Sequence, residues 1–210
     1  MAINNTCFSS TVCYNSGVRV KVCNFFVLAG PSGVGKTTLI KRLLEAKPDE
    51  VVHPLTETTR EKRPGEADGR EMIFLSHDLF APRLLGNEYL AHTEYDGHFY
   101  GTRKAHIVDA LRAGKKVVVA FDKGGIHCLR HQGFPAVCIY LVAPSPLRLG
   151  KWLEERWPDK GPAYEARLAQ ATNEFEEFER DREWRGMFDY FLFSDDMNQM
   201  VADTLTIMGF

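Results

Sequence analysis

Residues 30–38 read GPSGVGKTT and match the pattern G-x-x-x-x-G-K-[ST], a spacing suited to holding phosphate groups. In such a turn, backbone N–H groups and the positive end of the following helix surround phosphate oxygens. Glycines are needed because a side chain would collide with the anion or forbid the backbone dihedrals. The pattern predicts a nucleoside triphosphate site made of Gly30, Pro31, Ser32, Gly33, Val34, Gly35, Lys36, Thr37 and Thr38.

Two side chains of this turn are expected to contact the reacting end of the nucleotide. Lys36 is placed to reach the β and γ phosphates, and the Thr37 hydroxyl is placed to coordinate Mg²⁺. A nucleoside triphosphate and Mg²⁺ are therefore the expected ligands of this turn.

An acid follows a later apolar run, at the strand end where open α/β sheets bind ligands. Asp122 closes the stretch KKVVVAFD, where its carboxylate can orient Mg²⁺ or position an acceptor group. A cap for the turn that follows is the other interpretation of this residue.

A basic loop offers a second site for an anion. Arg60 and Arg63 lie three residues apart in TETTREKRPGEADG, residues 56–69. Two guanidinium groups at this spacing form a planar clamp with several donors, which suits a phosphate group. A solvated charged loop is the alternative.

Strand and helix patterns alternate along the chain around these residues. The apolar run VCNFFVLA, residues 22–29, predicts a strand buried on both faces, and KTTLIKRLLEA, residues 36–46, predicts a helix after it. Further strands are expected at 115–121, 136–143 and 188–193, each before a helical segment. This order predicts an α/β fold with a doubly wound parallel sheet.

The residue pattern changes at two places along the chain. A polar loop and short alternating strands, with the hairpin turn Asp96-Gly97, predict an inserted subdomain of mixed α/β structure at 56–102. Proline, glycine and charged residues interrupt two helical patterns at 154–163, which predicts a mobile lid. Residues 1–20 are expected to form a flexible extension. The core is expected to consist of residues 21–55, 103–153 and 164–210.

The segment 87–102, NEYLAHTEYDGHFYGT, is dense in aromatic and polar residues. If residues 89–95 form a regular strand, Tyr89, Ala91, Thr93 and Tyr95 share one face, and His92 and Glu94 point to the other. Glu88 lies just outside that strand and would reach the first face only through a register shift or bulge. Thr93, His98 and Tyr89 are then possible hydrogen-bonding partners for a ligand.

Composition narrows the class of protein. With 44% apolar residues, a net charge of −2 and a pI near 6.4, the chain can form one sizeable core and shows no preference for nucleic acid. No apolar run approaches the roughly 20 residues that a membrane span needs. An odd number of cysteines argues against a complete disulfide framework, so a cytoplasmic protein is expected. Residues 1–20, rich in Ser and Thr and free of acid, leave organelle import as a minor alternative.

Other conspicuous residues have structural interpretations. His127 and His131 are four apart on an expected helix, but no second pair completes a zinc site, so they predict a helix surface. The stretch 174–185, EFEEFERDREWR, predicts an amphipathic helix whose charges face solvent. The three tryptophans, Trp152, Trp157 and Trp184, are expected to pack helices, with Trp152 or Trp157 near the donor base as the alternative.

Taken together, these segments resemble the guanylate kinase family, which consists of nucleoside monophosphate kinases of the P-loop NTPase fold. The resemblance runs from about Phe25 to the C-terminus and rests on GPSGVGKTT, TTREKRPGE, GHFYGT, LRAGKKVVVAFD, ARLAQA and DYFLFSDD. It implies a parallel-sheet core with an inserted subdomain and a lid.

The resemblance also implies roles for individual residues. Arg60 and Arg63 fall where the family holds the phosphate of the acceptor nucleotide. Tyr100 and Thr102 match hydroxyl contacts to the acceptor, and Thr56 takes the place of a serine that contacts guanine. Catalytic roles are implied for residues around the transferred phosphoryl group: Lys36, Arg60, Asp122, Arg156 and Arg167.

Departures from the family pattern concentrate at the acceptor. Its guanine-reading glutamate falls at Ala91, a phosphate-binding tyrosine at Met72 and a strand-end acid at Ala120, while a lid arginine falls at Trp152. Loss of a buried carboxylate contact to a base is expected to weaken or redirect base recognition by a factor of about 10 or more.

The resemblance implies ATP-dependent phosphoryl transfer to a nucleoside monophosphate, GMP to GDP. A kinase for another phosphorylated acceptor, such as a different nucleotide or a ribose bisphosphate, is one alternative. An inactive phosphopeptide-binding module is another, although the intact Gly35, Lys36 and Thr37 favour an enzyme. The expected partners are small nucleotides, with no nucleic acid or membrane, and the chain is expected to be a monomer or homodimer.

Overall fold

A computed structural model describes residues 23–63, 65–69, 72–95, 97–156, 160–193 and 196–210, without the side chains of Tyr95 and Arg156. It also gives the backbone of two short strands in the predicted extension, β1 (Cys13–Asn15) and β2 (Val18–Val20), which pair antiparallel. The predicted flexibility of residues 1–20 concerns a segment that lies mostly outside the described residues.

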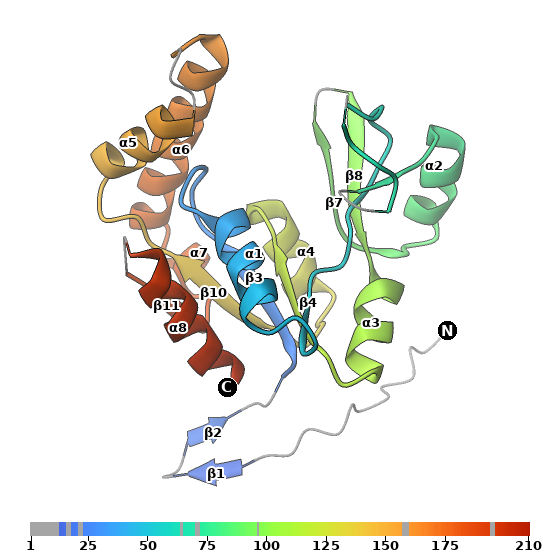
Figure 1. The fold of residues 1–210 in the computed structure, drawn as a ribbon, viewed down its shortest axis with the longest axis horizontal. Helices are drawn as coiled ribbons and strands as arrows, with labels where there is room; N and C mark the ends of the chain where they lie inside the picture. The colour runs from blue at the N-terminus through green and yellow to red at the C-terminus, as the bar shows by residue number, and fades with distance from the viewer. Residues whose placement is uncertain are drawn as a thin grey trace.

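A five-stranded parallel sheet forms the core (Figure 1), with the order β11-β10-β3-β9-β4. Its strands are β3 (Phe25–Ala29), β4 (Val51–Val52), β9 (Lys116–Ala120), β10 (Val137–Leu141) and β11 (Tyr190–Leu192). Every residue of β3 is buried, as expected for a central strand covered on both sides. The predicted doubly wound α/β core is confirmed.

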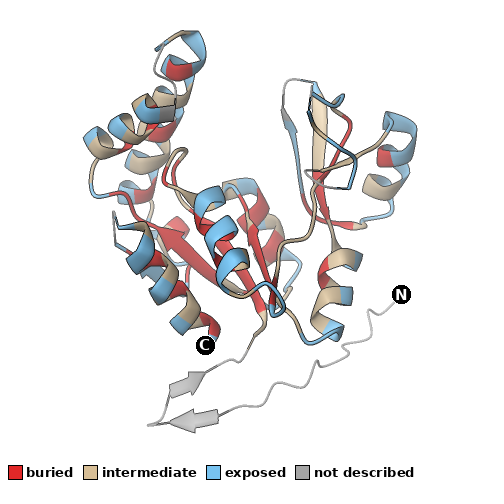
Figure 2. Cartoon of the chain, in the orientation of Figure 1, coloured by how far each residue is buried: buried red, intermediate tan, exposed pale blue. Residues whose placement is uncertain are grey.

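Alternate residues of β3 supply two apolar layers, one on each face of the sheet. Phe26 and Leu28 join a cluster with residues of α1 (Lys36–Ala46), α5 (Pro146–Arg156) and α8 (Met197–Met208). Phe25 and Val27 join a cluster with residues of α3 (Lys104–Arg112), α4 (Lys123–His131) and α7 (Arg182–Arg185). Figure 2 shows the buried residues concentrated on the strands between these helices. The long helix α6 (Pro162–Arg180) contributes Ala171 to the first cluster and Phe178 to the second.

A second sheet lies to the side of the core and corresponds to the predicted inserted subdomain (Figure 1). Its order is β6-β5-β8-β7, formed by β5 (Glu57–Thr58), β6 (Ile73–Phe74), β7 (Tyr89–Tyr95) and β8 (His98–Arg103), with α2 (His77–Leu85) beside it. Strands β7 and β8 form the predicted hairpin, in which Tyr95 is opposite His98. Asp96 of the predicted turn lies outside the described residues.

The β7 strand is not regular, and this corrects the predicted distribution of its side chains. Tyr89 is opposite Arg103, but Ala91 is opposite Thr102, so the register shifts by one residue between them. The bulge turns Tyr89 to the opposite face from Ala91 and Thr93, because each cross-strand pair shares a face. Tyr89 is therefore not on the face that was expected to meet a ligand.

The predicted helix at 174–185 is also corrected. The helix α6 ends at Arg180, and Asp181 starts the separate helix α7 by accepting a hydrogen bond from the Trp184 N–H at 2.9 Å.

No helix within the described part of the chain is long and apolar enough to cross a membrane.

Candidate active site

The turn between β3 and α1 has the backbone that the glycine pattern requires. Gly30, Gly33 and Gly35 have φ angles of 144°, 85° and 101°. A Cβ atom at Gly33 would lie 2.8 Å from the side chain of Leu153, and one at Gly30 would lie 2.6 Å from the carbonyl oxygen of Leu141. The positive φ angles favour glycine at both positions, and at Gly30 the backbone oxygen of Leu141 also leaves no space for a side chain.

This turn forms one wall of a cavity of about 750 Å³. The cavity brings together predicted residues from distant parts of the chain: Gly30, Ser32, Gly33, Val34, Gly35, Lys36, Thr37, Thr38, Asp122 and Arg167. Pro31 is buried and does not line it. The cavity lies at the carboxyl ends of β3 and β9, where an open α/β sheet binds its ligands.

Lys36 is a partly buried cation of this cavity. Its Nζ donates hydrogen bonds to the carbonyl oxygens of Gly30 at 2.6 Å and Pro31 at 3.0 Å. Burial lowers the pKa of Lys36 to about 8, while the negative charges of Glu174 and Asp122 act in the opposite direction. The ammonium group is thus poised to gain stabilisation from a bound polyanion.

Glu174 is a member of the site that sequence reasoning missed. Its Oε2 accepts a hydrogen bond of 2.6 Å from the backbone N–H of Ser32, although the sequence predicted that charges in 174–185 face solvent. Gln170 donates to Glu174 Oε1 at 2.7 Å, and Arg167 donates to Gln170 Oε1 at 3.0 Å. The separations of three and four residues between these polar side chains place them along one face of α6, a clue that was visible in the sequence.

Asp122 fulfils the capping role and also lies at the site. Its Oδ1 accepts a hydrogen bond of 2.8 Å from the Gly125 N–H, which caps the N-terminus of α4. The same residue lines both the large cavity and a smaller one. The two interpretations drawn from the sequence are therefore compatible, and the catalytic role stays a prediction.

The smaller cavity, of about 150 Å³, lies between the core sheet and the inserted subdomain. Three predicted acceptor residues line it: Thr56, Tyr100 and Thr102. Ala91, Thr93 and Ala120 line it as well. Because Ala120, Phe121 and Asp122 line both cavities, the two spaces adjoin at the end of β9.

The predicted arginine clamp lines neither of these cavities. Arg60 donates from Nη2 to both oxygens of Glu66, at 2.9 Å each, and from Nη1 to the Glu61 carbonyl at 2.6 Å. Arg63 is exposed, and its backbone N–H donates to Glu66 at 2.8 Å, which is the main cause that lowers the pKa of Glu66. The two arginines therefore gather around one carboxylate. Arg156 ends α5, and its side chain lies outside the described residues.

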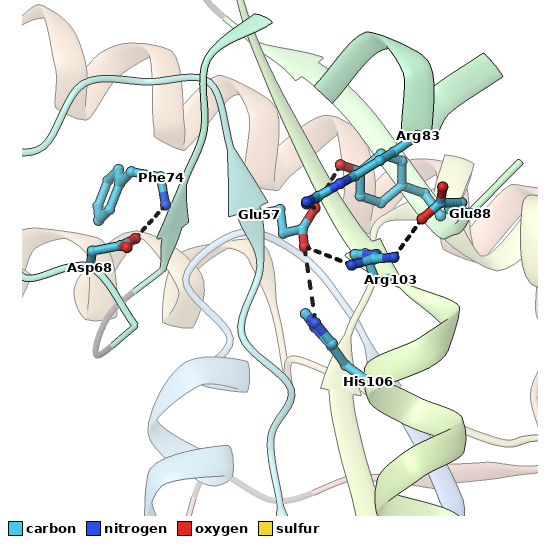
Figure 3. Close-up of polar contacts among 8 residues, drawn as sticks. Glu57, Asp68, Phe74, Arg83, Glu88, Arg103 and His106 are labelled. Atoms are coloured by element: carbon cyan, nitrogen blue, oxygen red, sulfur yellow. Dashed lines mark hydrogen bonds and ion pairs between the residues drawn. The ribbon is translucent and has the colours of Figure 1, made fainter. Parts of the chain in front are cut away.

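The other face of the inserted subdomain holds a buried carboxylate (Figure 3). Glu57 accepts hydrogen bonds of 2.7 Å from Arg83 and from the Tyr89 hydroxyl, and Arg103 lies 3.8 Å away. Arg103 also pairs with Glu88 at 2.5 Å. Burial and the bond to Glu57 raise the pKa of Tyr89. Tyr89 and Glu88, both considered as ligand contacts, instead hold α2, β5, β7 and β8 together.

The remaining candidates divide between the cavity and the surface. Trp152 lines the large cavity with the Arg148 guanidinium 5.4 Å from its ring, whereas Trp157 lies outside the described residues. His127 and His131 are exposed on α4, as predicted. Within the described residues, no group of three or more His, Cys, Asp or Glu side chains forms a metal cluster.

Fold and cavity together define a P-loop protein of the α/β class, with a glycine-rich turn between a buried parallel strand and a helix. The family model described as Guanylate kinase matches residues 23–209, and the chain belongs to the guanylate kinase family.

Two relatives agree with this assignment, and a solved structure has a similar fold. The guanylate kinase of Dechloromonas aromatica (strain RCB) is 35% identical over 185 residues, which cover 88% of this chain and 88% of the relative. That of Caulobacter vibrioides is 35% identical over 179 residues, with 84% and 80% covered. The crystal structure of guanylate kinase from Anaplasma phagocytophilum matches with a TM-score of 0.61 at 24% identity, covering 88% of this chain and 83% of that one, and it supports the fold.

Proposed function

We propose that this protein is a nucleotide kinase that transfers the γ-phosphoryl group of ATP to GMP, giving ADP and GDP. The observation that carries the proposal is the junction of two cavities at Asp122. One cavity contains the glycine-rich turn with Lys36, and the other contains the hydroxyl groups of Thr56, Tyr100 and Thr102. A donor and an acceptor bound in adjoining spaces can bring their phosphates together, which is most of what phosphoryl transfer requires.

In this proposal an oxygen of the acceptor phosphate forms the new bond to the γ-phosphorus, and the bond between that phosphorus and the β,γ-bridging oxygen breaks. Lys36 and Arg167 neutralise charge on the transferred group, and Arg156 does so from the end of α5. No covalent enzyme intermediate is needed.

The residues at the large cavity suit Mg²⁺. The hydroxyl of Thr37 and the carboxylate of Asp122 both line it, and they are oxygen donors of the kind that Mg²⁺ prefers. When bound, the ion supplies neutralisation of the donor phosphates. Thr37 and Asp122 are the residues that we propose hold it, directly or through water.

Closure is part of the proposed mechanism. Arg60 and Arg63 belong to the inserted subdomain and line neither cavity, so they reach the acceptor phosphate only if that subdomain moves toward the core. Residues 154–163, which run from the end of α5 to the start of α6 and include residues 157–159 outside the described part of the chain, are the proposed lid that excludes water.

A second candidate function follows from the lining of the smaller cavity. A guanine edge presents N–H donors that a carboxylate accepts well, yet Ala91 and Ala120 provide none. Hydroxyl groups both donate and accept, so they suit other ring systems equally. The alternative is a kinase of the same mechanism that acts on a different nucleotide or a ribose bisphosphate.

The test is ADP release from ATP·Mg²⁺ by purified protein over GMP, dGMP, AMP, UMP, CMP and ribose phosphates. Turnover that is highest with GMP supports the first function, and turnover that is highest with another acceptor supports the second. If no acceptor gives ADP release although ATP binding is retained, the result would instead indicate a phosphopeptide-binding module. Lys36→Ala is expected to abolish turnover on any acceptor.

We propose that the protein works in the cytoplasm as a monomer or homodimer. Its proposed partners are small nucleotide substrates, with no nucleic acid or membrane. Two of the described cysteines, Cys128 and Cys138, are free thiols, and a reducing compartment keeps thiols in this form.

A further inference from the structure

The glycine-rich turn already binds an anion from its own chain. Glu174 Oε2 lies 2.6 Å from the backbone nitrogen of Ser32. Among the described residues, it is the one side chain that accepts a hydrogen bond from a backbone N–H of residues 30–38. A carboxylate oxygen is an anionic acceptor like a phosphate oxygen, so Glu174 occupies a donor group that would otherwise be available to nucleotide.

The carboxylate lies inside the cavity rather than beside it. Glu174 lines the same space as Gly33 and Lys36, and its negative charge raises the pKa of Lys36 against the effect of burial. A polyphosphate that enters this space competes with the carboxylate for N–H donors. The like charges of the two groups also repel each other.

A side-chain relay connects this carboxylate to Arg167, the arginine proposed to neutralise the transferred group. Gln170 donates to Glu174 through its amide nitrogen and accepts from Arg167 through its amide oxygen, at 2.7 Å and 3.0 Å. A change in the position of Glu174 therefore alters what the Gln170 amide offers to Arg167.

We propose that Glu174 is an internal anion that occupies the phosphate cradle of the empty protein, and that the phosphates of the incoming donor displace it. Its displacement releases Gln170, which in turn releases the Arg167 Nη1 contact and directs that guanidinium toward the transferred group. This inference rests on the proposed binding of donor nucleotide at residues 30–38. Glu174 acts through the cradle and Arg167, and it is a positioning residue.

The proposal predicts that wild-type affinity is reduced by the self-occupied state, because apparent affinity scales with the fraction of protein that is ready to bind. Glu174→Gln removes the charge and leaves a weaker acceptor. Glu174→Asp keeps the charge but is one methylene shorter, so it loses the reach to Ser32. Both variants are expected to bind phosphate-bearing ligands more tightly than the wild type. The gain in affinity is roughly 3–10-fold for Glu174→Gln, since a bond to a charged acceptor is stronger than one to the neutral amide that replaces it. The gain is smaller for Glu174→Asp, because that variant keeps the negative charge.

The measurement is calorimetric titration with ATP, tripolyphosphate and adenosine at pH 6.5. This pH lies below the pKa of about 8 of Lys36, so the ammonium group is charged in the wild-type protein. The gain is expected for the two phosphate-bearing ligands and not for adenosine. Glu176→Gln, on the exposed side of α6 where Glu176 pairs with Arg180 at 3.6 Å, is the control with the same change in net charge.

The outcomes separate this inference from the proposed function. Tighter binding by both Glu174 variants, with Glu176→Gln unchanged, supports an internal anion. Unchanged or weaker binding by both variants overturns it, because Glu174 then only holds the turn in shape. An equal gain in Glu176→Gln overturns it too, since net charge alone then accounts for the gain. Wild-type protein that binds neither ATP nor tripolyphosphate would instead defeat the proposed function.

Discussion

The carboxylate of Glu66 receives the Arg60 Nη2 group between its two oxygens, at 2.9 Å from each. At the other proposed phosphate-binding element, one oxygen of Glu174, Oε2, accepts a hydrogen bond from the Ser32 N–H at 2.6 Å. In this structure, two of the proposed phosphate contacts, the Arg60 guanidinium and the Ser32 N–H, are thus each engaged by a glutamate from the chain itself. Internal carboxylates keep these donors satisfied, since an unpaired buried donor is costly.

We predict that Arg60→Lys weakens binding of the acceptor strongly and changes binding of ATP little. A guanidinium has donors enough to keep Glu66 while it binds a phosphate, whereas an ammonium on a flexible stem is a single point charge. The KM of the acceptor is expected to rise roughly 10-fold or more, and the Kd of ATP to stay within about 2-fold, because the loss is one bidentate contact at one site. Steady-state kinetics and ATP titration measure the two values.

Arg112→Lys is the matched control for that change, because Arg112 forms an exposed pair with Asp109 at 3.6 Å and lines neither cavity. Equal acceptor kinetics for Arg60→Lys and this control would show that the Arg60 guanidinium does not bind the acceptor.

Binding of ATP is predicted to take up protons above neutral pH. Burial holds the pKa of Lys36 at about 8 in the empty protein, so the side chain is charged at pH 6.5 and mostly neutral at pH 8.5. Bound phosphates favour the charged form and raise this pKa. Binding at pH 8.5 is therefore expected to take up roughly 0.7 proton at Lys36, and affinity is expected to fall as the pH rises above 8.

Calorimetry in two buffers of different ionisation enthalpy measures that uptake directly. Lys36→Arg should lose it, because a guanidinium stays protonated across this range. An uptake at pH 8.5 that persists in Lys36→Arg would assign the proton to a different group.

Glu57→Ala is predicted to destabilise the inserted subdomain strongly. Glu57 is 1% exposed and accepts bonds from Arg83 and Tyr89, so its removal leaves a partly buried guanidinium and a buried hydroxyl without their acceptor. The free energy of unfolding is expected to fall by about 3 kcal/mol, within the range for breaking buried ion pairs. Urea denaturation measures this, and Asp109→Asn, at an exposed pair, should change it by less than about 0.5 kcal/mol.

Sequence reasoning located the core and the phosphate cradle well, because each depends on a local pattern. The run FFVLA is apolar at every position, so it predicted a doubly covered strand, and the helix at 36–46 was predicted with the bounds that the structure has. The glycine spacing specifies a backbone shape directly, since Gly33 and Gly35 adopt positive φ angles.

The errors arose where a tertiary contact overrides a local pattern. One extra residue in β7 turns Tyr89 away from the acceptor side, and alternation alone cannot reveal a bulge. Glu174 was expected to face solvent because its helix is rich in charge, yet its partner is a backbone N–H 142 residues away in the chain. Periodicity shows which residues share a face, but not which face meets a ligand site.

Ala91→Glu is predicted to sharpen recognition of guanine. Ala91 lines the smaller cavity on the same face of the hairpin as Thr102, at the position where the resemblance implies a glutamate. A carboxylate there can accept from both N–H groups of a guanine edge, a contact worth about 1–3 kcal/mol of discrimination. The ratio of kcat/KM for GMP to that for IMP, which lacks the exocyclic amine, is expected to rise roughly 10-fold. Ala105→Glu, on the exposed surface of α3, adds the same charge outside the cavity and should leave the ratio unchanged. If Ala91→Glu folds with normal ATP affinity and the ratio does not rise, the base does not lie against Ala91, and the smaller cavity is not where this enzyme reads its acceptor.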